Sequence, residues 1–208
     1  MSVEQPVIFV VDDDASAREG IEDLLQSVGL RVMTFGSPQE FLDRVRPDAH
    51  GCIVLDVRLP GTSGLEFQKV LADAGIRLPV IFITGHSDIP MSVTAMKSGA
   101  IEFLTKPFRE QALLDAINAG IEKDRLRREG SNRVLELQQR FERLTPRERE
   151  VFALVVTGRP NKQVAAELGL SEMTVKVHRS QVTKKMRATS VVELARIADR
   201  LGLSPEKP

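Results

Sequence analysis

The sequence predicts a protein in two parts, an α/β domain with a doubly wound parallel sheet and a smaller all-α domain after it. In the first part, short continuous apolar runs alternate with segments of helical spacing, which is typical of buried parallel strands covered by helices. The second part shows helical spacing throughout. The charge changes with the pattern, because residues 1–124 contain 11 Lys and Arg against 19 Asp and Glu, whereas residues 125–208 contain 18 against 10. A chain of 208 residues is long enough for two modest domains.

Five strand–helix repeats account for the first part. The apolar runs predict strands over residues 7–11, 30–35, 52–55, 80–83 and 101–104. The segments between them predict helices over residues 15–28, 38–45, 65–74, 88–98 and from about 109. Ser37 and Pro38 resemble an N-cap and a first-turn proline, and residues 59–64 are a predicted loop because they are rich in Gly and Pro. The alternation predicts a (βα)5 arrangement with helices on both faces of the sheet.

A helical linker is predicted over residues 125–142. The last helix of the first domain has apolar residues at three- and four-residue spacing and can continue past residue 124. Gly130-Ser131-Asn132 interrupts this pattern, which resumes from Val134 to Leu144. Two interrupted heptads are too short to establish a coiled coil, so packing within the chain and pairing with a second copy both remain open.

Four helices are predicted in the second domain, residues 143–204. Thr145-Pro146-Arg147-Glu148 combines an N-cap, a first-turn proline and a Glu at the capping-box position. A short helix over residues 161–168 is followed, after Gly169-Leu170-Ser171, by a longer one, and a last helix covers residues 190–201. Two helices joined by a three-residue turn that contains glycine form a helix-turn-helix pattern.

Composition limits the class of protein and its partners. Cys52 is the one cysteine and lies in an apolar run, so neither a disulfide framework nor a cysteine metal site is available. The N-terminus lacks the features of a signal peptide, and no apolar run approaches the roughly 18–20 residues that span a bilayer. We therefore expect a cytoplasmic protein with no membrane partner. The basic second part indicates nucleic acid as a partner, although a solvated face rich in arginine would have the same charge.

Polar side chains stand where the apolar runs of the first domain end. Asp12-Asp13-Asp14 follows the first run, Asp56 the third and Thr84 the fourth, and Lys106 follows the last run. Each has an ordinary explanation by itself, as a helix cap or a solvated lysine. In an open α/β sheet, however, ligands bind outside the carboxyl ends of the strands. Carboxylates, a hydroxyl and an ammonium at successive strand ends predict a single pocket for phosphoryl transfer.

The chemistry of such a pocket follows from its groups. Carboxylate oxygens are the ligands that Mg²⁺ prefers beside phosphate oxygens. A carboxylate such as Asp56, neutralised by the metal, can attack phosphorus and form an acyl phosphate. The transferring group spreads negative charge over three oxygens, so the Lys106 ammonium and the Thr84 hydroxyl would both stabilise it.

Four strings surround these side chains: Val10-Val11-Asp12-Asp13-Asp14, Val54-Leu55-Asp56 with Pro60-Gly61, Thr84-Gly85 and Phe103-Leu104-Thr105-Lys106-Pro107. With them, residues 5–124 resemble the receiver domain of two-component response regulators. The resemblance implies that Asp56 accepts the phosphoryl group from a phosphohistidine of a sensor histidine kinase. It also implies an acidic pair, Asp12 and Asp13, with Mg²⁺ held by Asp13, Asp56 and the backbone carbonyl of Arg58.

The same resemblance implies a switch. Lys106 would contact the phosphate, and the Lys106-Pro107 bond would be cis, which proline tolerates at low cost. Thr84 would move toward the new charge, and the Phe103 ring would turn into the space that it leaves. The face of the fourth helix and fifth strand would then repack, which is a shift between two packings.

Three strings of the second domain carry a further resemblance: Gly158-Arg159-Pro160-Asn161-Lys162-Gln163-Val164-Ala165, Leu168-Gly169-Leu170-Ser171 and Thr174-Val175-Lys176-Val177-His178-Arg179. They are similar to the LuxR-type helix-turn-helix over about residues 141–204. The similarity implies that the helix beginning near Ser171 enters the major groove. It implies base contacts from Lys176, Val177 and Ser180. It further implies phosphate contacts from Thr174, Arg179, Lys184 and Asn161.

The order receiver, linker and LuxR-type domain resembles the FixJ/NarL class of transcriptional regulators, and residues 85–100 resemble its FixJ-like branch. This implies that phosphorylation of Asp56 promotes a homodimer, which binds promoter DNA and regulates transcription with RNA polymerase. We expect no enzymatic activity beyond autocatalytic phosphoryl transfer and self-dephosphorylation at Asp56.

Two other interpretations are open. Aspartyl-phosphate phosphatases also use a strand-end Asp with Mg²⁺ and Lys, but they usually place a second Asp two residues after the nucleophile, where this chain has Arg58. Alternatively, the chain binds DNA and its receiver domain is vestigial. The complete set of Asp12, Asp13, Asp56, Thr84 and Lys106 argues against that interpretation.

Overall fold

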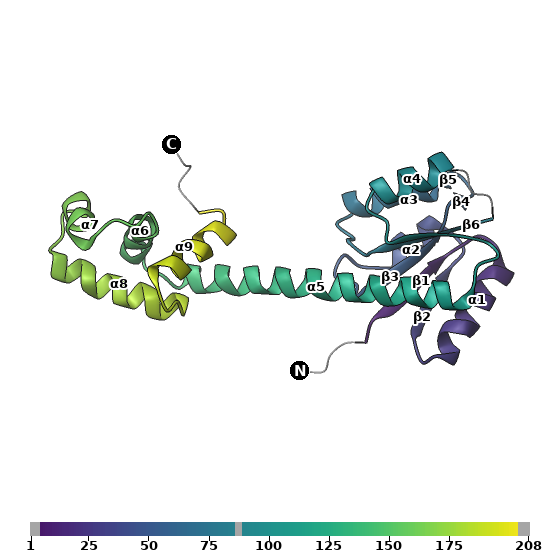
Figure 1. Cartoon of the computed structure of the whole chain (residues 1–208), viewed down its shortest axis with the longest axis horizontal. Helices are drawn as coiled ribbons and strands as arrows, with labels where there is room; N and C mark the ends of the chain where they lie inside the picture. The colour runs from purple at the N-terminus through teal and green to yellow at the C-terminus, as the bar shows by residue number, and fades with distance from the viewer. Residues whose placement is uncertain (1–4, 86–88, 204–208) are drawn as a thin grey trace. The chain divides into compact units, whose positions relative to one another are not determined.

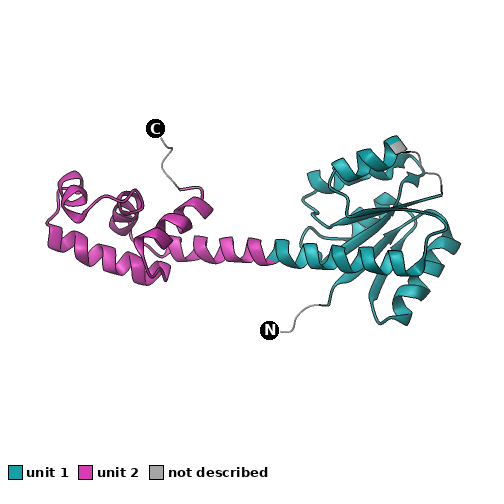
Figure 2. Ribbon diagram, in the orientation of Figure 1, with its two compact units in different colours: residues 1–128 teal, residues 129–208 magenta. Residues whose placement is uncertain are grey.

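The structure is a computed structural model, and it describes residues 5–85 and 89–203. The chain forms two compact units, residues 1–128 and 129–208 (Figure 2). The division falls after Arg128, inside a long helix and four residues beyond the domain end predicted at residue 124.

A parallel five-stranded sheet forms the centre of the first unit. Its strands are β1 (Val7–Val11), β2 (Arg31–Phe35), β3 (Gly51–Asp56), β6 (Val80–Thr84) and β7 (Glu102–Thr105), in the order β2-β1-β3-β6-β7. Every neighbouring pair is parallel. The order reverses direction between β1 and β3, and a ligand crevice is expected at the carboxyl ends of strands at such a point. The predicted α/β fold is confirmed.

Five helices cover the two faces of this sheet (Figure 1). They are α1 (Ala15–Ser27), α2 (Pro38–Arg44), α3 (Gly64–Asp73), α4 (Ile89–Lys97) and α5 (Glu110–Glu142). Side chains of α1 and α5 form the core on one face, and those of α2, α3 and α4 form the core on the other. The alternation along β3 produces both cores: Ile53 and Leu55 point to one face, and Cys52 and Val54 to the other.

Two predicted local signals are confirmed and one prediction is corrected. Ser37 caps α2 by accepting from the Glu40 N–H, with Pro38 in the first turn. Residues 59–64, predicted as a loop, instead contain part of a small antiparallel hairpin of β4 (Arg58–Leu59) and β5 (Thr62–Ser63). Strands of two residues are too short to show a period in the sequence. The predicted start of the fourth helix at Asp88 lies outside the described residues.

The predicted interruption at Gly130-Ser131-Asn132 is wrong, because α5 continues without a break from Glu110 to Glu142. A glycine inside a helix costs about 1 kcal/mol relative to alanine. A Cβ on Gly130 would meet nothing within 4 Å, so this glycine fills no packing need. An established helix adds one hydrogen bond for each further residue, which is enough to carry it through such a segment.

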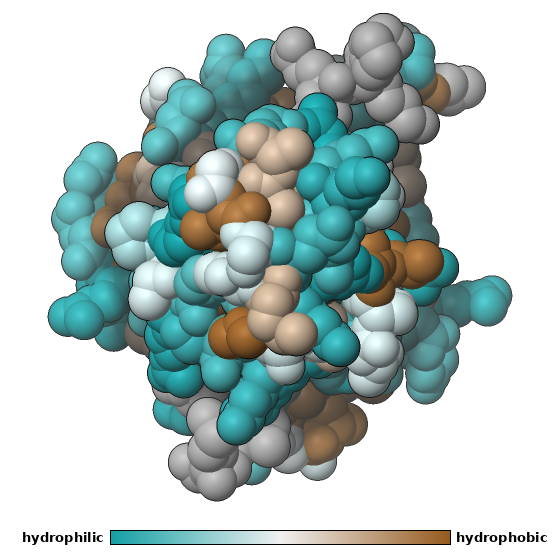
Figure 3. All heavy atoms as spheres, turned by 90° about the vertical axis from the view of Figure 1, so that its left-hand side faces the viewer, coloured by the Kyte–Doolittle hydropathy of each residue, from teal (hydrophilic) through white to brown (hydrophobic). Residues whose placement is uncertain are grey.

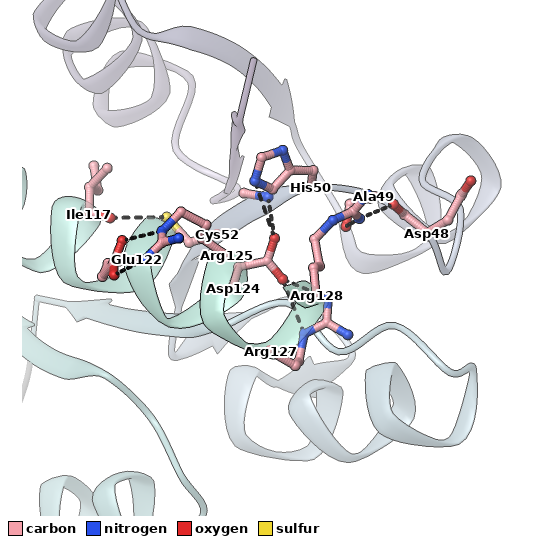
Figure 4. A network of polar contacts seen from close by, with 11 residues as sticks. Asp48, Ala49, His50, Cys52, Ile117, Glu122, Asp124, Arg125, Arg127 and Arg128 are labelled. Atoms are coloured by element: carbon pink, nitrogen blue, oxygen red, sulfur yellow. Dashed lines mark hydrogen bonds and ion pairs between the residues drawn. The ribbon is translucent and has the colours of Figure 1, made fainter. Parts of the chain in front are cut away.

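A buried carboxylate attaches the middle of α5 to the sheet (Figure 4). Asp124 is fully buried, and it accepts from the Gly51 N–H at 3.1 Å and from Arg127 Nη2 at 2.6 Å. The Arg128 guanidinium donates to the Asp48 carbonyl oxygen at 2.7 Å. The first residue of β3 and the segment before it thus hold α5 at residues 124–128.

Cys52 lies next to this contact, and its thiol is buried between β3 and α5. A Cβ placed on Gly120 would lie 2.9 Å from the Cys52 Cβ, so α5 approaches β3 closely there. Burial, with a smaller effect of the Asp124 carboxylate, raises the pKa of Cys52 to about 12. The predicted core thiol is confirmed.

The native protein should therefore react with iodoacetamide far more slowly than the unfolded chain, whose thiol has a pKa of about 8.5. Between the two pKa values the folded chain keeps the thiol proton and the unfolded chain loses it. The free energy of unfolding should therefore decrease as the pH rises through that range. Mass spectrometry measures the rate of Cys52 alkylation, with the guanidinium-unfolded chain as the control. Equal rates for the native and unfolded chains would contradict it.

Four helices form the second unit together with the end of α5. They are α6 (Pro146–Val155), α7 (Asn161–Leu168), α8 (Glu172–Met186) and α9 (Val191–Arg200). Thr145, Ser171 and Ser190 accept the N-cap hydrogen bonds, and Gly169 ends α7 in the left-handed conformation. The Phe141 ring of α5 packs edge-on against Phe152 of α6. The predicted all-α domain is confirmed, and none of the described helices has the length and apolarity to cross a bilayer.

Glu148 is a buried charge in this unit. Its side chain accepts from the Thr145 N–H at 2.7 Å and from Lys185 Nζ at 2.6 Å, and only 5% of the residue is exposed. Burial opposes its ionisation, but the hydrogen bonds from Lys185 and Thr145 outweigh this and hold the pKa of Glu148 below its ordinary value.

Glu148→Gln should lower the free energy of unfolding by about 1–3 kcal/mol, because Lys185 would lose its counter-charge. Glu150→Gln removes a carboxylate that is 49% exposed in its ion pair with Arg147, and it should change the free energy of unfolding by less than about 0.5 kcal/mol. The stabilisation by Glu148 is present above the ordinary Glu pKa and lost as the pH falls through the lower folded-state pKa. Urea unfolding at neutral and acidic pH measures both effects. If Glu148→Gln lowers the free energy of unfolding as much at acidic pH as at neutral pH, the assignment is wrong.

Candidate functional site

The carboxyl ends of β1 and β3 bring three acidic side chains together. The two strands are neighbours in register, Val11 opposite Leu55, so the next residues, Asp12 and Asp56, lie side by side. One carboxylate oxygen from each of Asp12, Asp13 and Asp56 lies within 4.8 Å of the others. Asp12 is fully buried and Asp56 is 7% exposed, whereas Asp13 faces solvent. The predicted acidic pocket is present.

Asp14 has a different role from its two neighbours. Its carboxylate accepts from the Ser16 and Ala17 N–H groups and caps α1. The third aspartate of the run thus begins the helix that follows β1. Arg18 of the same helix donates to the Asp12 carbonyl oxygen at 2.6 Å and so holds the backbone beside the pocket. No pattern in the sequence predicted this contact.

Lys106 reaches the same pocket from the end of β7. Its Nζ lies 2.5 Å from Asp12 Oδ2 and 2.8 Å from Asp56 Oδ2, so one ammonium joins both buried carboxylates. Its backbone N–H donates to the Thr84 carbonyl oxygen at 2.7 Å, which fixes the start of the loop. The bond to Pro107 is cis, as the resemblance implies.

Burial and charge shift the proton affinities in this pocket. Burial raises the pKa of Asp12, against the hydrogen bonds that it accepts from Lys106 and the Asp14 N–H. Burial also favours the neutral amine of Lys106, but its hydrogen bonds to Asp12 and Asp56 prevail and raise the pKa of this lysine. At neutral pH the lysine is therefore a permanent cation beside Asp56.

The environment of Asp56 suits a phosphoacceptor. Its Oδ1 accepts from the Arg58 N–H at 2.9 Å, while Oδ2 is held by Lys106. Three converging carboxylates are the oxygen donors that a hard divalent cation requires, so the residues present fit Mg²⁺. Arg58 adjoins the pocket through its backbone, while its side chain is exposed. That its carbonyl is a metal ligand stays a prediction.

Thr84 and Phe103 lie on adjacent strands next to the pocket. Thr84 ends β6 and is fully buried. Phe103 pairs in register with Phe82 of β6, its ring centroid 6.4 Å from that of Phe82, and it is half-buried. The geometry thus places a hydroxyl residue near Lys106 and a partly covered ring on the neighbouring strand. Their movement as a switch stays a prediction.

The exposed face of α8 is a second candidate site. Lys176, Val177, Ser180 and Lys184 are all exposed. Met173, which the sequence analysis did not single out, is 68% exposed, four residues before Val177 at 54%. Figure 3 looks onto the side where α7 and the start of α8 lie, and it shows a few hydrophobic residues among hydrophilic ones. Exposed apolar side chains beside lysines are suited to a surface that meets both base edges and phosphates.

The other predicted DNA contacts are partly engaged within the unit. Arg179 donates to Asn161 Oδ1 at 2.9 Å, which joins the middle of α8 to the first residue of α7. The Thr174 hydroxyl lies 2.8 Å from that of Ser171 at the start of α8. Thr174, Arg179 and Asn161 are half-buried. Part of each side chain therefore packs within the unit, and only the rest is available to DNA.

Two family models match the chain. Residues 8–118 match the response regulator receiver domain. Residues 142–198 match the bacterial regulatory proteins of the luxR family.

Curated relatives match along nearly the whole chain. Nodulation protein W of Bradyrhizobium diazoefficiens is 56% identical, over 95% of this chain and 87% of its own length. The transcriptional regulatory protein FixJ of Azorhizobium caulinodans is 42% identical, over 95% of this chain and 94% of its own length. Among solved structures, response regulator StyR is 49% identical, with a TM-score of 0.83 over 95% of this chain and all of its own.

Proposed function

Because this chain belongs to the two-component response regulators of the FixJ/NarL class, with a receiver domain and a LuxR-type DNA-binding domain, we propose that Asp56 is its phosphoacceptor. The observation that carries the proposal is the Asp56 carboxylate, held 2.8 Å from Lys106 beside two further aspartates. Phosphorylation there regulates binding of the second unit to promoter DNA.

The transfer uses groups that the chain already places. Asp56 attacks the phosphorus of a phosphohistidine on a sensor histidine kinase, the P–N bond breaks, and an acyl phosphate forms. Asp12, Asp13 and Asp56 would hold Mg²⁺, which supplies positive charge to the phosphoryl oxygens when bound. Lys106 leaves its contact with Asp56 Oδ2 for a phosphoryl oxygen, and the Thr84 hydroxyl donates to another.

Phosphorylation of Asp56 leads two copies of the chain to form a homodimer. The supporting observation is that Val93 and Met96 of α4 are 44% and 45% exposed, an apolar area next to the β7 edge. Movement of Thr84 and Phe103 would repack that face and favour pairing. Two DNA-binding units would then bind half-sites about one helical turn apart and act on RNA polymerase in the cytoplasm.

We propose no enzymatic turnover beyond phosphoryl transfer to Asp56 and its hydrolysis. A phosphatase would need a general acid two residues after the nucleophile, and Arg58 cannot serve as one. Steady hydrolysis of p-nitrophenyl phosphate by the protein would contradict this assignment.

Acetyl phosphate with Mg²⁺ tests the proposal on the whole protein. We expect a label on Asp56, a shift from monomer to dimer in sedimentation, and a footprint on genomic DNA that strengthens with labelling. Labelled protein that sediments and binds DNA as the unlabelled protein does would contradict the link between phosphorylation and DNA binding.

A further inference from the structure

The second unit contains a cavity of about 470 Å³ that the DNA-contacting residues do not line. It lies between residues 133–140 of α5, the turn from α8 to α9, and one face of α9. A volume of this size is in the range of small-ligand sites. Five arginines line it: Arg133, Arg140, Arg187, Arg196 and Arg200.

The positive charge of this cavity exceeds its negative charge. Its two carboxylates are engaged locally: Glu136 accepts from Arg140 at 3.2 Å, and Glu193 accepts from the N–H and hydroxyl of Thr189, both at 2.7 Å. Within the described part of the chain, the guanidinium groups of Arg187 and Arg200 form no ion pair and donate no hydrogen bond. Arg196 forms no ion pair there either, but its charge adds to the Thr189 hydrogen bonds that hold the pKa of Glu193 below its ordinary value.

The backbone also places an arginine at the cavity wall. Arg187 ends α8 with φ 54° and ψ 38°, and it is the one residue other than glycine with a positive φ among the described residues. Glycine or asparagine is the ordinary choice for this conformation. Arg196 and Arg200 lie one helical turn apart on α9, on the same face, so they can approach one ligand together.

We propose that this cavity binds an anion with two or more phosphate groups. The planar fork of arginine matches phosphate oxygens in pairs, and several arginines around one hollow suit a polyvalent anion better than a single charge. Because α5 and α9 both line the cavity, the bound anion joins the end of the linker helix to the last helix. The phosphates come either from a free di- or polyphosphate or from the DNA backbone.

Inorganic pyrophosphate is the probe, titrated calorimetrically into the full-length protein without Mg²⁺. We expect saturable binding at one site, weakened about tenfold or more by Arg196→Ala with Arg200→Ala, because charged hydrogen bonds would be lost. Arg143→Ala removes an exposed guanidinium of the same unit that does not line the cavity, and it should leave the affinity unchanged. Absence of binding, or equal binding by all three proteins, would overturn the proposal.

The source of the phosphates is separated by a DNA titration. If DNA backbone phosphates occupy the cavity, the double variant should lose about 0.9 in the slope of log affinity against log salt for each phosphate, and DNA should displace pyrophosphate. If the slope is unchanged while pyrophosphate binding is lost, the ligand is a free anion. No phosphoryl donor is present in either titration, so neither result depends on phosphorylation of the receiver.

Discussion

Asp56→Asn should abolish labelling by acetyl phosphate or a phosphorylated kinase and with it the stimulation of DNA binding. An amide is not a nucleophile toward phosphorus, so no acyl phosphate can form. The fold should remain, because the Asn oxygen can still accept from the Arg58 N–H, and Lys106 keeps its 2.5 Å contact with Asp12. The measurements are radioactive labelling, sedimentation and DNA binding on the same preparation.

Asp14→Asn is the matched control for this change. It removes one negative charge two residues from Asp12, but asparagine is an equally good N-cap for α1. Because Asp14 is not one of the three converging carboxylates, labelling should stay close to the wild-type level. The proposal would fail if Asp56→Asn still accepted the label, or if it dimerised and activated a promoter in response to the kinase.

Lys176→Ala should weaken binding to the specific operator by about 1–3 kcal/mol and reduce discrimination at the base pair that it contacts. Lys176 is exposed on α8, next to the exposed Val177. A lysine that donates to guanine acceptors contributes to specificity, whereas a phosphate contact contributes to affinity for every sequence. Affinities for the operator and for single-base variants measure the difference.

Lys184→Ala provides the comparison, because Lys184 is exposed on the same helix and is assigned to phosphate. It should weaken binding to all sequences alike and reduce the salt slope by about 1. If Lys176→Ala instead weakened operator and random DNA equally, Lys176 would be a phosphate contact. Neither variant should change labelling of Asp56, so these results do not depend on the receiver.

Local patterns in the sequence predicted an element correctly where one kind of interaction determines that element. The apolar runs predicted the five strands because both faces of a parallel sheet are buried, and Thr145 and Glu148 predicted the start of α6 because a capping box is a contact between residues three apart. The same approach was wrong at Gly130, because the cost of one glycine is small beside the hydrogen bonds of a long helix. It also missed the hairpin of β4 and β5, whose strands are too short to have a period.

Local patterns predicted which groups meet at the carboxyl edge of the sheet, since Asp12, Asp56 and Lys106 follow apolar runs whose order in a right-handed α/β fold is strongly constrained. Which of these groups contact one another depends on the three-dimensional packing. It joins Lys106 to two carboxylates at once and buries Asp124 against the Gly51 N–H. The same holds for the arginine-lined cavity, where residues of α5, of α9 and of the turn between α8 and α9 converge. These contacts join residues that are distant in the chain, and their geometry depends on packing that no local pattern encodes.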